Sequence, residues 1–311
     1  MDGTMKFLER YFFNPTLGQK LIAFALLPVS ICVFVAATLR RALSPTKNYK
    51  AAIVSVGNLV VGGSGKTPLV IALAKDYEPN CAIVLRGYKR KSKGLVVVSH
   101  NGRVVVDVNK SGDEAQLLSQ RLPFATVIVS EDRHKGIEKA MKLGRRIIFL
   151  DDGFRFKCNK LNILLRSQLQ PYYSFCIPSG AYREAPSAYK TADIVLNEGK
   201  EYSREVVVKN PTERMLLVTA IANPSRLEQF LPAIVGRLSY SDHSFFSKER
   251  IALEMEKSGA TSVLVTEKDE VKMKDFGFPL SVLKLEMVVD PAVYGAVRDY
   301  IGRYQQYLPQ T

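Results

Sequence analysis

The sequence predicts an α/β fold with a mainly parallel sheet, a second and smaller α/β lobe, and a membrane-associated helix at the N-terminus. Three observations predict it: strand-like apolar runs alternate with helical segments, the alternation resumes after a charged connector, and residues 21–39 carry no charge. A chain of 311 residues is long enough for about two ordinary domains. The expected division is an N-terminal segment at 1–45, a larger domain at 46–200 and a smaller lobe at 201–311.

Short apolar runs predict the strands, and the longer segments between them predict the helices. In the larger domain the expected strands are 51–59, 81–88, 124–130, 145–153 and 192–199, with a hairpin over 95–108 that turns at Asn101 and Gly102. The expected helices there are 67–75, 113–122 and 133–144. In the smaller lobe a strand-bearing linker at 200–214 precedes a second α/β set at 215–224, 260–269 and 281–290 and a final helix at 291–307.

The uncharged run at 21–39 would form a single helix about 28 Å long, which is close to the hydrocarbon thickness of a bilayer. It has no cleavage pattern of a signal peptide, and Pro28 weakens an uninterrupted helix. A helix embedded in the inner leaflet is favoured over a full span or a helix buried in a soluble core. The flanking charges are divided, because Lys6, Arg10 and Lys20 precede the run while Arg40, Arg41, Lys47 and Lys50 follow it. Just upstream, Met5, Leu8 and Phe12 share one helical face, as in an interfacial anchor.

The composition restricts the kinds of partner and site. The formal net charge of +14 favours anionic partners such as an acidic membrane surface or a phosphorylated substrate. No basic tail or aromatic-basic stripe concentrates that charge, so no nucleic-acid partner is expected. The four cysteines are scattered and there are three histidines, which argues against a zinc site or a disulfide framework and favours a reduced, cytosolic compartment.

The stretch VGGSGKTP at 61–68 lies between a predicted strand and a predicted helix, as a phosphate-binding loop does. A strict Walker A motif would need glycine at position 60, where this chain has Val60. Main-chain amides of such a loop and the helix N-terminus attract phosphate oxygens, the lysine contacts the β- and γ-phosphates, and the threonine binds Mg²⁺. The expected ATP-binding residues are Gly62, Gly63, Ser64, Gly65, Lys66 and Thr67.

Asp151 and Asp152 end the apolar strand at 145–153, where the Walker B carboxylate of a magnesium site belongs. Together with Thr67 they are the expected Mg²⁺ ligands. Membrane-bound partitioning ATPases carry a signature lysine before the paired glycines, and Val61 stands there in this chain. The substitution favours a kinase over a switch of that type.

Four further strings accompany the loop: SGDEA at 111–115, IPSGAYREAP at 177–186, SDHSFF at 241–246 and VTEKDEVK at 265–272. With VGNLVVGGSGKTP, RGY and DDG, in this order, the chain resembles the tetraacyldisaccharide 4'-kinase family, the lipid A 4'-kinases of Gram-negative bacteria. The resemblance extends from the N-terminal helix to about residue 272. It implies transfer of the ATP γ-phosphate to the 4'-hydroxyl of a disaccharide lipid 1-phosphate, by a monotopic membrane enzyme of two α/β lobes joined by a strand linker.

The resemblance also implies roles for individual residues. It assigns Asp113 and His243 to an Asp–His pair that acts as base on the acceptor hydroxyl, as an imidazole oriented by a carboxylate can. The matching RE and RGY strings imply acceptor contacts at Arg183, Glu184, Arg86 and Tyr88. Three departures from the family pattern, which are Arg155 after DDGF, Ala115 after GDE and PSGAYRE at 178–184, affect substrate contacts more than the reaction class. For the TEKD string of Glu267, Lys268 and Asp269, the sequence does not distinguish catalysis from lobe packing.

The expected partners are therefore a lipid A disaccharide precursor and inner-membrane lipids, with ATP and Mg²⁺ as cofactors and no obligate protein partner. The expected location is the cytoplasmic face of the inner membrane. Two other classes remain open. A membrane-associated P-loop NTPase switch would hydrolyse nucleotide without a lipid acceptor, and a nucleic-acid-binding ATPase would show salt-sensitive DNA or RNA binding.

Overall fold

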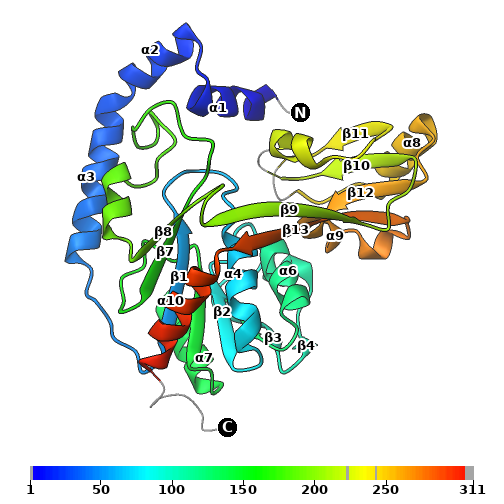
Figure 1. Cartoon of the computed structure of the whole chain (residues 1–311). Helices are drawn as coiled ribbons and strands as arrows, with labels where there is room; N and C mark the ends of the chain where they lie inside the picture. The colour runs from blue at the N-terminus through cyan, green and yellow to red at the C-terminus, as the bar shows by residue number, and fades with distance from the viewer. Residues whose placement is uncertain (1–2, 222–223, 242–243, 305–311) are drawn as a thin grey trace.

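A computed structural model describes residues 3–221, 224–241 and 244–304. Over these residues the chain forms two α/β lobes and three N-terminal helices, of which α3 runs along one side of the larger lobe while α1 and α2 lie at one end of it (Figure 1). The predicted fold class, with its large, mainly parallel sheet and second, smaller lobe, is confirmed. His243 lies outside the described residues.

The larger lobe is built on an eight-stranded sheet of order β4-β3-β5-β2-β6-β1-β7-β8. All neighbours are parallel except the pairs β3–β4 and β3–β5. The strands are β1 (Ala52–Asn58), β2 (Cys81–Leu85), β3 (Val96–His100), β4 (Arg103–Val104), β5 (Thr126–Val129), β6 (Ile147–Asp151), β7 (Leu161–Arg166) and β8 (Ile194–Asn197). The central strands β1, β2, β5 and β6 are buried along their whole length, because helices cover both faces of the sheet.

The two faces of this sheet carry different helices. On one face α4 (Lys66–Ala74), α6 (Asp113–Arg121) and α10 (Pro291–Gly302) share a single apolar core with the strands. On the other face α7 (Arg133–Lys142) packs through Ile137 and Ala140 against β1, β2, β5 and β6. The short elements η1 (Lys75–Tyr77), α5 (Val108–Ser111) and η2 (Pro186–Thr191) complete the lobe.

The smaller lobe has a five-stranded sheet of order β11-β10-β12-β13-β9. Its strands are β9 (Tyr202–Lys209), β10 (Met215–Thr219), β11 (Gly236–Ser239), β12 (Ser262–Thr266) and β13 (Leu280–Val289). Its helices are η3 (Pro224–Phe230), α8 (Lys248–Ser258), α9 (Glu267–Glu270) and η4 (Lys274–Phe276). The antiparallel pair β9–β13 runs from one lobe to the other (Figure 1), and Tyr202, Met287 and Val289 at one end of it belong to the core of the larger lobe.

The C-terminal helix α10 packs on the larger sheet, where Val293, Val297 and Ile301 are buried in the same core as α4. The sequence grouped this helix with the smaller lobe by its position in the chain. We therefore propose domains at 46–200 plus α10 and at 201–290, with the N-terminal segment at 1–45 kept as a separate unit. The β9–β13 pair would then be the linker.

The N-terminal segment forms α1 (Gly3–Phe13), α2 (Leu17–Ala25) and α3 (Leu27–Leu43). The expectation of one continuous helix over 21–39 is wrong, because the chain bends by 49° between α2 and α3. Pro28 lies in the first turn of α3, where its missing N–H is tolerated but where it cannot continue α2. No single helix among the described residues has the length and apolar character to cross a bilayer, and Leu17–Ala25 with Leu27–Leu39 meets that test only as a bent pair.

A small number of polar contacts dock these helices on the larger lobe. The Tyr11 hydroxyl donates to the Pro178 carbonyl at 3.1 Å, and the Ser30 hydroxyl accepts from the Ser179 amide at 2.9 Å. Most of the apolar side chains point away from the protein, as Leu21 and Leu39 do with 67% and 56% of their surface exposed. This exposure contradicts the alternative in which the apolar run is buried in a soluble core.

Candidate active site

The glycine-rich loop joins β1 to α4 at the carboxyl end of the larger sheet, the edge where α/β proteins bind ligands. Because β1 lies between β6 and β7, the loop is next to the residues that end β6. Gly62 and Gly65 have φ values of 102° and 84°, a backbone conformation that favours glycine. The predicted strand–loop–helix context of VGGSGKTP is therefore present.

The start of the loop is fixed by a short antiparallel pairing with the segment around Tyr182. The Val61 amide donates to the Ala181 carbonyl at 2.9 Å, and the Arg183 amide donates to the Leu59 carbonyl at 2.7 Å. The loop and the IPSGAYREAP segment are thus held together by main-chain hydrogen bonds. This pairing brings Arg183, more than 100 residues later in the sequence, to the carboxyl end of β1.

Lys66 and Thr67 begin α4 and point toward the residues that end β1 and β6. The Lys66 ammonium donates to Asn58 Oδ1 at 3.0 Å and lies 3.8 Å from Asp152 Oδ1. The Thr67 hydroxyl donates to Asp151 Oδ2 at 2.7 Å. A cation, a hydroxyl and two carboxylates therefore meet at a helix N-terminus, where main-chain N–H groups also attract phosphate.

Asp151 and Asp152 are adjacent in sequence but sit in different surroundings. Asp151 is 5% exposed, and burial raises its pKa to about 7, helped by the charge of Glu114 and opposed by Thr67 and Lys66. Burial also pushes the pKa of Asp152 upward, but Lys66, Arg183 and Arg133 outweigh it and hold that pKa at about 2. At neutral pH Asp152 is therefore charged, and Asp151 is poised to gain or lose a proton.

Arg183 binds Asp152 through both terminal nitrogens, at 2.9 Å and 3.0 Å. One of them also donates to the main-chain and side-chain oxygens of Asn58. A bidentate arginine holds a carboxylate in one orientation. The resemblance implied an acceptor contact for Arg183, and in the structure this side chain orients Asp152 next to Lys66.

Two further residues belong to the site but were not predicted from the sequence. Asn58 accepts from Lys66 and also hydrogen-bonds the loop through Val60 O at 2.5 Å. Arg133, the first residue of α7, donates to the Asp151 and Asp152 carbonyls at 3.0 Å and 2.8 Å. Burial lowers the pKa of Arg133, with the two aspartates opposing the change. Asn58 could have been predicted from its place in VGN, at the end of the strand before the loop. The sequence around Arg133 gives no indication that this residue belongs to the site.

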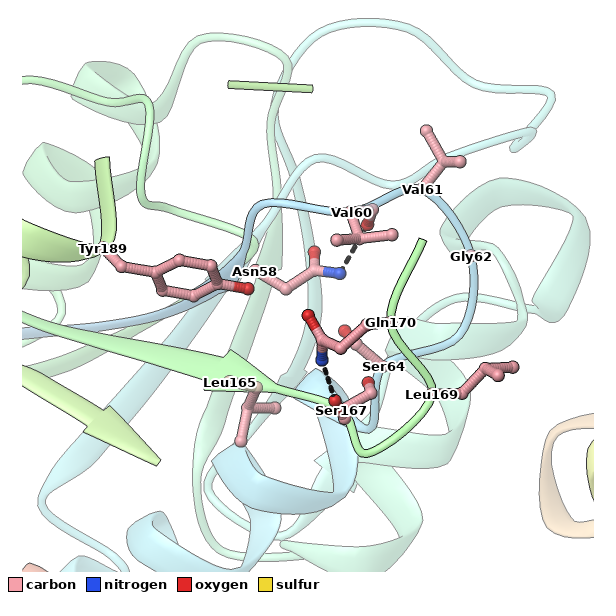
Figure 2. A pocket seen from close by; sticks show the side chains of 10 residues that line it. All are labelled: Asn58, Val60, Val61, Gly62, Ser64, Leu165, Ser167, Leu169, Gln170 and Tyr189. Carbon is pink, nitrogen blue, oxygen red and sulfur yellow. Dashed lines mark hydrogen bonds between the residues drawn. The ribbon is translucent and has the colours of Figure 1, made fainter. Parts of the chain in front are cut away.

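A small recess lies beside the loop on the β7 side. Figure 2 shows the Asn58 side chain directed at Val60, with Tyr189 and Gln170 also lining the recess from different segments of the chain. The recess is lined by Asn58, Val60, Val61, Gly62, Ser64, Leu165, Ser167, Leu169, Gln170 and Tyr189. Its walls come from the loop, the ends of β1 and β7, the segment that follows β7, and η2, so this recess lies at the carboxyl end of the sheet.

The smaller lobe touches the loop through the β9–β13 pair. Arg204 Nη2 of β9 donates to the Ser64 carbonyl at 3.3 Å. A Cβ atom on Gly65 would lie 3.1 Å from Met287 Cε of β13, a tight contact that a small shift of the methionine could relieve, so it is mainly the φ value of 84° that favours glycine there. The β9–β13 pair and the loop are therefore in direct contact.

The other predicted residues that the structure describes all lie in the larger lobe, some buried and some on its surface. Asp113 is buried at the first position of α6, and its Oδ2 lies 3.6 Å from Lys272 of the smaller lobe. Arg86 and Tyr88 follow β2 with exposed side chains. Glu184 is buried and accepts a hydrogen bond from Arg155 at 2.6 Å. Arg155, one of the three departures from the family pattern, is therefore the partner of Glu184.

The donor set at the loop suits a hard divalent cation. Within the parts of the chain that the structure describes, no three His, Cys, Asp or Glu side chains form a metal-binding group. Mg²⁺ is commonly held by one or two carboxylates together with phosphate oxygens and water. The Thr67 hydroxyl and the Asp151 carboxylate, already in contact at 2.7 Å, are oxygen donors of that kind.

Gly153 follows the two aspartates and packs without room for a side chain. A Cβ there would lie 2.5 Å from Leu150 Cβ and 2.8 Å from Ser55 Oγ, both of them buried. We expect Gly153→Ala to lower the free energy of unfolding by about 1–3 kcal/mol, since the overlap must be relieved by moving β1 or β6. Thermal unfolding measures the effect. The control is Gly295→Ala in α10, which has no atom within 4 Å of the added carbon, and equal melting temperatures for the two variants would contradict the packing argument.

Known proteins of one family are similar to this chain in sequence and in fold. A family model described as "LpxK: Tetraacyldisaccharide-1-P 4'-kinase" matches residues 22–301. Tetraacyldisaccharide 4'-kinases of Helicobacter acinonychis and Helicobacter pylori are 50% and 49% identical over 305 residues, which is 98% of this chain and 97% of theirs. The crystal structure of "apo" form LpxK from Aquifex aeolicus in complex with ATP superposes with a TM-score of 0.75 and 26% identity, covering 91% of this chain and 99% of that one. The chain belongs to the tetraacyldisaccharide-1-phosphate 4'-kinase family.

Proposed function

We propose that this protein transfers the γ-phosphate of ATP to the 4'-hydroxyl of a tetraacyldisaccharide 1-phosphate, a precursor of lipid A. The observation that carries the proposal is the convergence of Lys66, Thr67, Asp151, Asp152 and Arg183 at the carboxyl end of β1 and β6. The reaction is a substitution at phosphorus. The acceptor oxygen forms a bond to the γ-phosphorus, the bond to the ADP oxygen breaks, and the acceptor proton passes to a base.

ATP is the donor that this loop suits. The solved relative from Aquifex aeolicus was crystallised with ATP, and Gly62, Gly63, Ser64 and Gly65 here form a glycine-rich loop between a strand and a helix. Their main-chain amides would hold the phosphates, with Lys66 neutralising the charge that develops on the transferred group. Arg183 would keep Asp152 oriented, so that Lys66 is shared between that carboxylate and the nucleotide.

Mg²⁺ would be held by Thr67 and Asp151, with Asp152 in support. When bound, the ion supplies positive charge that stabilises the phosphate oxygens. Thr67 and Asp151 are already joined by a hydrogen bond, so the two oxygens are close enough to contact one ion. Arg133 binds the carbonyls of both aspartates and so keeps the end of β6 in place.

The acceptor proton needs a base, and Asp113 with His243 is the proposed pair. Asp113 lies at the start of α6, the helix next to α4 on the same face of the sheet, and its burial suits a carboxylate that orients an imidazole. Arg86 and Tyr88, exposed after β2, and Glu184 would line the side of the site that receives the sugar.

A lipid acceptor requires the protein to work at a bilayer surface. The exposed apolar side chains of α2 and α3, with the upstream helix α1, would lie in the cytoplasmic leaflet of the inner membrane. Inner-membrane lipids would thus be partners of the N-terminal segment, and the net charge of +14 favours an anionic surface.

Transfer of labelled phosphate tests the proposal. Purified protein in detergent micelles, given ATP labelled at the γ-position and tetraacyldisaccharide 1-phosphate, is expected to place the label on the lipid. The lipid lacking a free 4'-hydroxyl is the matched control and is expected to stay unlabelled. Hydrolysis of ATP at the same rate with and without the lipid, and with no labelled lipid, would instead support the NTPase switch.

The base is tested separately by His243→Ala. We expect kcat to fall by about 100-fold, toward the lower end of what general base catalysis contributes, with the KM for ATP nearly unchanged. Steady-state kinetics with varied ATP at saturating lipid measure both constants. A variant with wild-type kcat would rule out His243 as the base and leave the transfer reaction itself in place.

A further inference from the structure

The TEKD string lies at the junction between the two lobes. Thr266 ends β12 and caps α9, its hydroxyl accepting from the Asp269 amide at 3.2 Å. The helix α9 of the smaller lobe faces α6 of the larger lobe, whose first residue is Asp113. The TEKD string therefore lies next to α6, the helix that begins with the proposed catalytic residue Asp113.

Three ion pairs join the two helical segments. Arg121 Nη1 donates to both carboxylate oxygens of Glu267, at 2.9 Å and 2.8 Å. The second pair is Lys268 with Glu114 at 3.5 Å, and the third is Lys272 with Asp113 at 3.6 Å. Acidic residues at the start of α6 meet lysines from the smaller lobe, and a basic residue at its end meets a glutamate. The charges thus fix the register of α6 against the smaller lobe.

The Lys272 pair differs from the other two because it is excluded from water. The Lys272 side chain is 2% exposed and that of Asp113 is 5% exposed. Lys272 also binds Asp269 at 2.9 Å, and the Asp269 side chain is fully buried. Asp269 is in turn fixed to the ends of two strands, because its Oδ2 accepts from Thr219, the Ala220 amide and Thr266.

Lys272 has one more contact, on the segment that carries His243. Its ammonium donates to the Ser244 carbonyl at 3.2 Å and lies 4.8 Å from the centre of the Phe246 ring. Ser244 is the residue after His243 in the sequence. One buried ammonium therefore joins Asp113 of the larger lobe, Asp269 of the smaller lobe and the backbone next to His243.

A buried ion pair is a poor source of stability, because removing the charges from water opposes folding, but it defines relative position well. We propose that Lys272 is a positioning residue for phosphate transfer, which holds the Asp113 carboxylate and the segment from Ser244 to Phe246 in one arrangement across the lobe junction. The proposal rests on the proposed function. The TEKD string thereby has a role in aligning the proposed Asp–His catalytic base, which is distinct from nucleotide binding at the loop.

The test is a double substitution, Asp269→Asn with Lys272→Met, which removes one negative and one positive charge. It is compared with the wild-type protein. The asparagine can still accept from Thr219 and Thr266, and no carboxylate is left at position 269 without its lysine. We expect kcat to fall by about 10–100-fold, as small misplacements of reacting groups do, with the KM for ATP unchanged within threefold. The control is Lys274→Met, an exposed lysine of η4 close in sequence, which is expected to keep the wild-type kcat.

A purely structural role predicts a different outcome, in which the folded double variant has a lower melting temperature but the wild-type kcat at temperatures where it is folded. That result would overturn the proposal. If the double variant fails to fold, Lys272→Gln, which keeps a hydrogen-bond donor and removes the charge, is expected to show the same fall in kcat, and a wild-type kcat in it would equally overturn the proposal. Absence of lipid labelling by the wild-type protein would refute the proposed function instead, so the two failures are distinguishable.

Discussion

Lys66→Ala is expected to lower kcat/KM for transfer to the lipid by on the order of 10³-fold, equivalent to about 4 kcal/mol of transition-state stabilisation. The Lys66 ammonium stands at the N-terminus of α4, 3.0 Å from Asn58 Oδ1 and 3.8 Å from Asp152. Its charge acts in a site that is partly shielded from water, where electrostatic stabilisation of the transferred phosphate is strong. No other lysine in the loop can replace it.

The measurement is the rate of lipid labelling under kcat/KM conditions, together with the melting temperature. Because the Lys66 ammonium contacts polar groups and the side chain belongs to no apolar core cluster among the described residues, the variant should fold normally. Lys93→Ala, which removes an exposed lysine between β2 and β3, is the matched control and should leave the rate unchanged. If Lys66→Ala turned over at the wild-type rate, the loop would have no part in the mechanism.

The parts of this site that the sequence predicted are those encoded locally. The loop at 61–68 and the aspartates at 151–152 each follow an apolar strand, and parallel strands bring their carboxyl ends to the same edge of the sheet. The register Val56↔Asp151 brings the two segments side by side. Neighbouring strand ends in one sheet can be inferred without knowing the whole topology.

The parts that were missed depend on tertiary structure. Arg133 reaches the aspartates because α7 packs on the opposite face of the sheet, and strand β7 was not predicted because LNILLR is short and interrupted by Asn162. The helix α8 had ordinary end signals, with Ser247 as its N-cap and Gly259 as its C-cap, but they were not used. The bend between α2 and α3 was signalled by Pro28, yet apolar composition alone favoured one helix.

Asp151→Asn is expected to have effects of opposite sign on activity and on stability. The transfer rate should fall by on the order of 10³-fold, because an amide does not supply the negative charge that a Mg²⁺ ligand provides. The melting temperature of the protein without nucleotide or metal should rise at pH 8. The asparagine oxygen still accepts the hydrogen bond from Thr67, so the local geometry is retained.

The sign of the stability effect follows from the raised pKa of Asp151. Burial lifts it from 3.8 to about 7, so between these values the folded protein keeps a proton that the unfolded chain has lost. Stability therefore falls as pH rises through this range, and above pH 7 the buried charge opposes folding in full, by on the order of 2–4 kcal/mol. Asparagine carries no such charge, so its advantage should be large at pH 8 and small at pH 5.

Thermal unfolding at pH 5 and pH 8 with a chelator present measures this difference, and repeating it with ATP and Mg²⁺ separates the ligand effect. The wild-type protein should gain more stability from the added ligands than the variant, since binding to the folded state stabilises it in proportion to affinity. A residue that served only to support the fold would lose stability and activity together when replaced. A lower melting temperature for Asp151→Asn at pH 8 would therefore contradict the assignment of Asp151 as a Mg²⁺ ligand. A buried carboxylate whose charge destabilises the fold is expected to be retained for its role in the reaction.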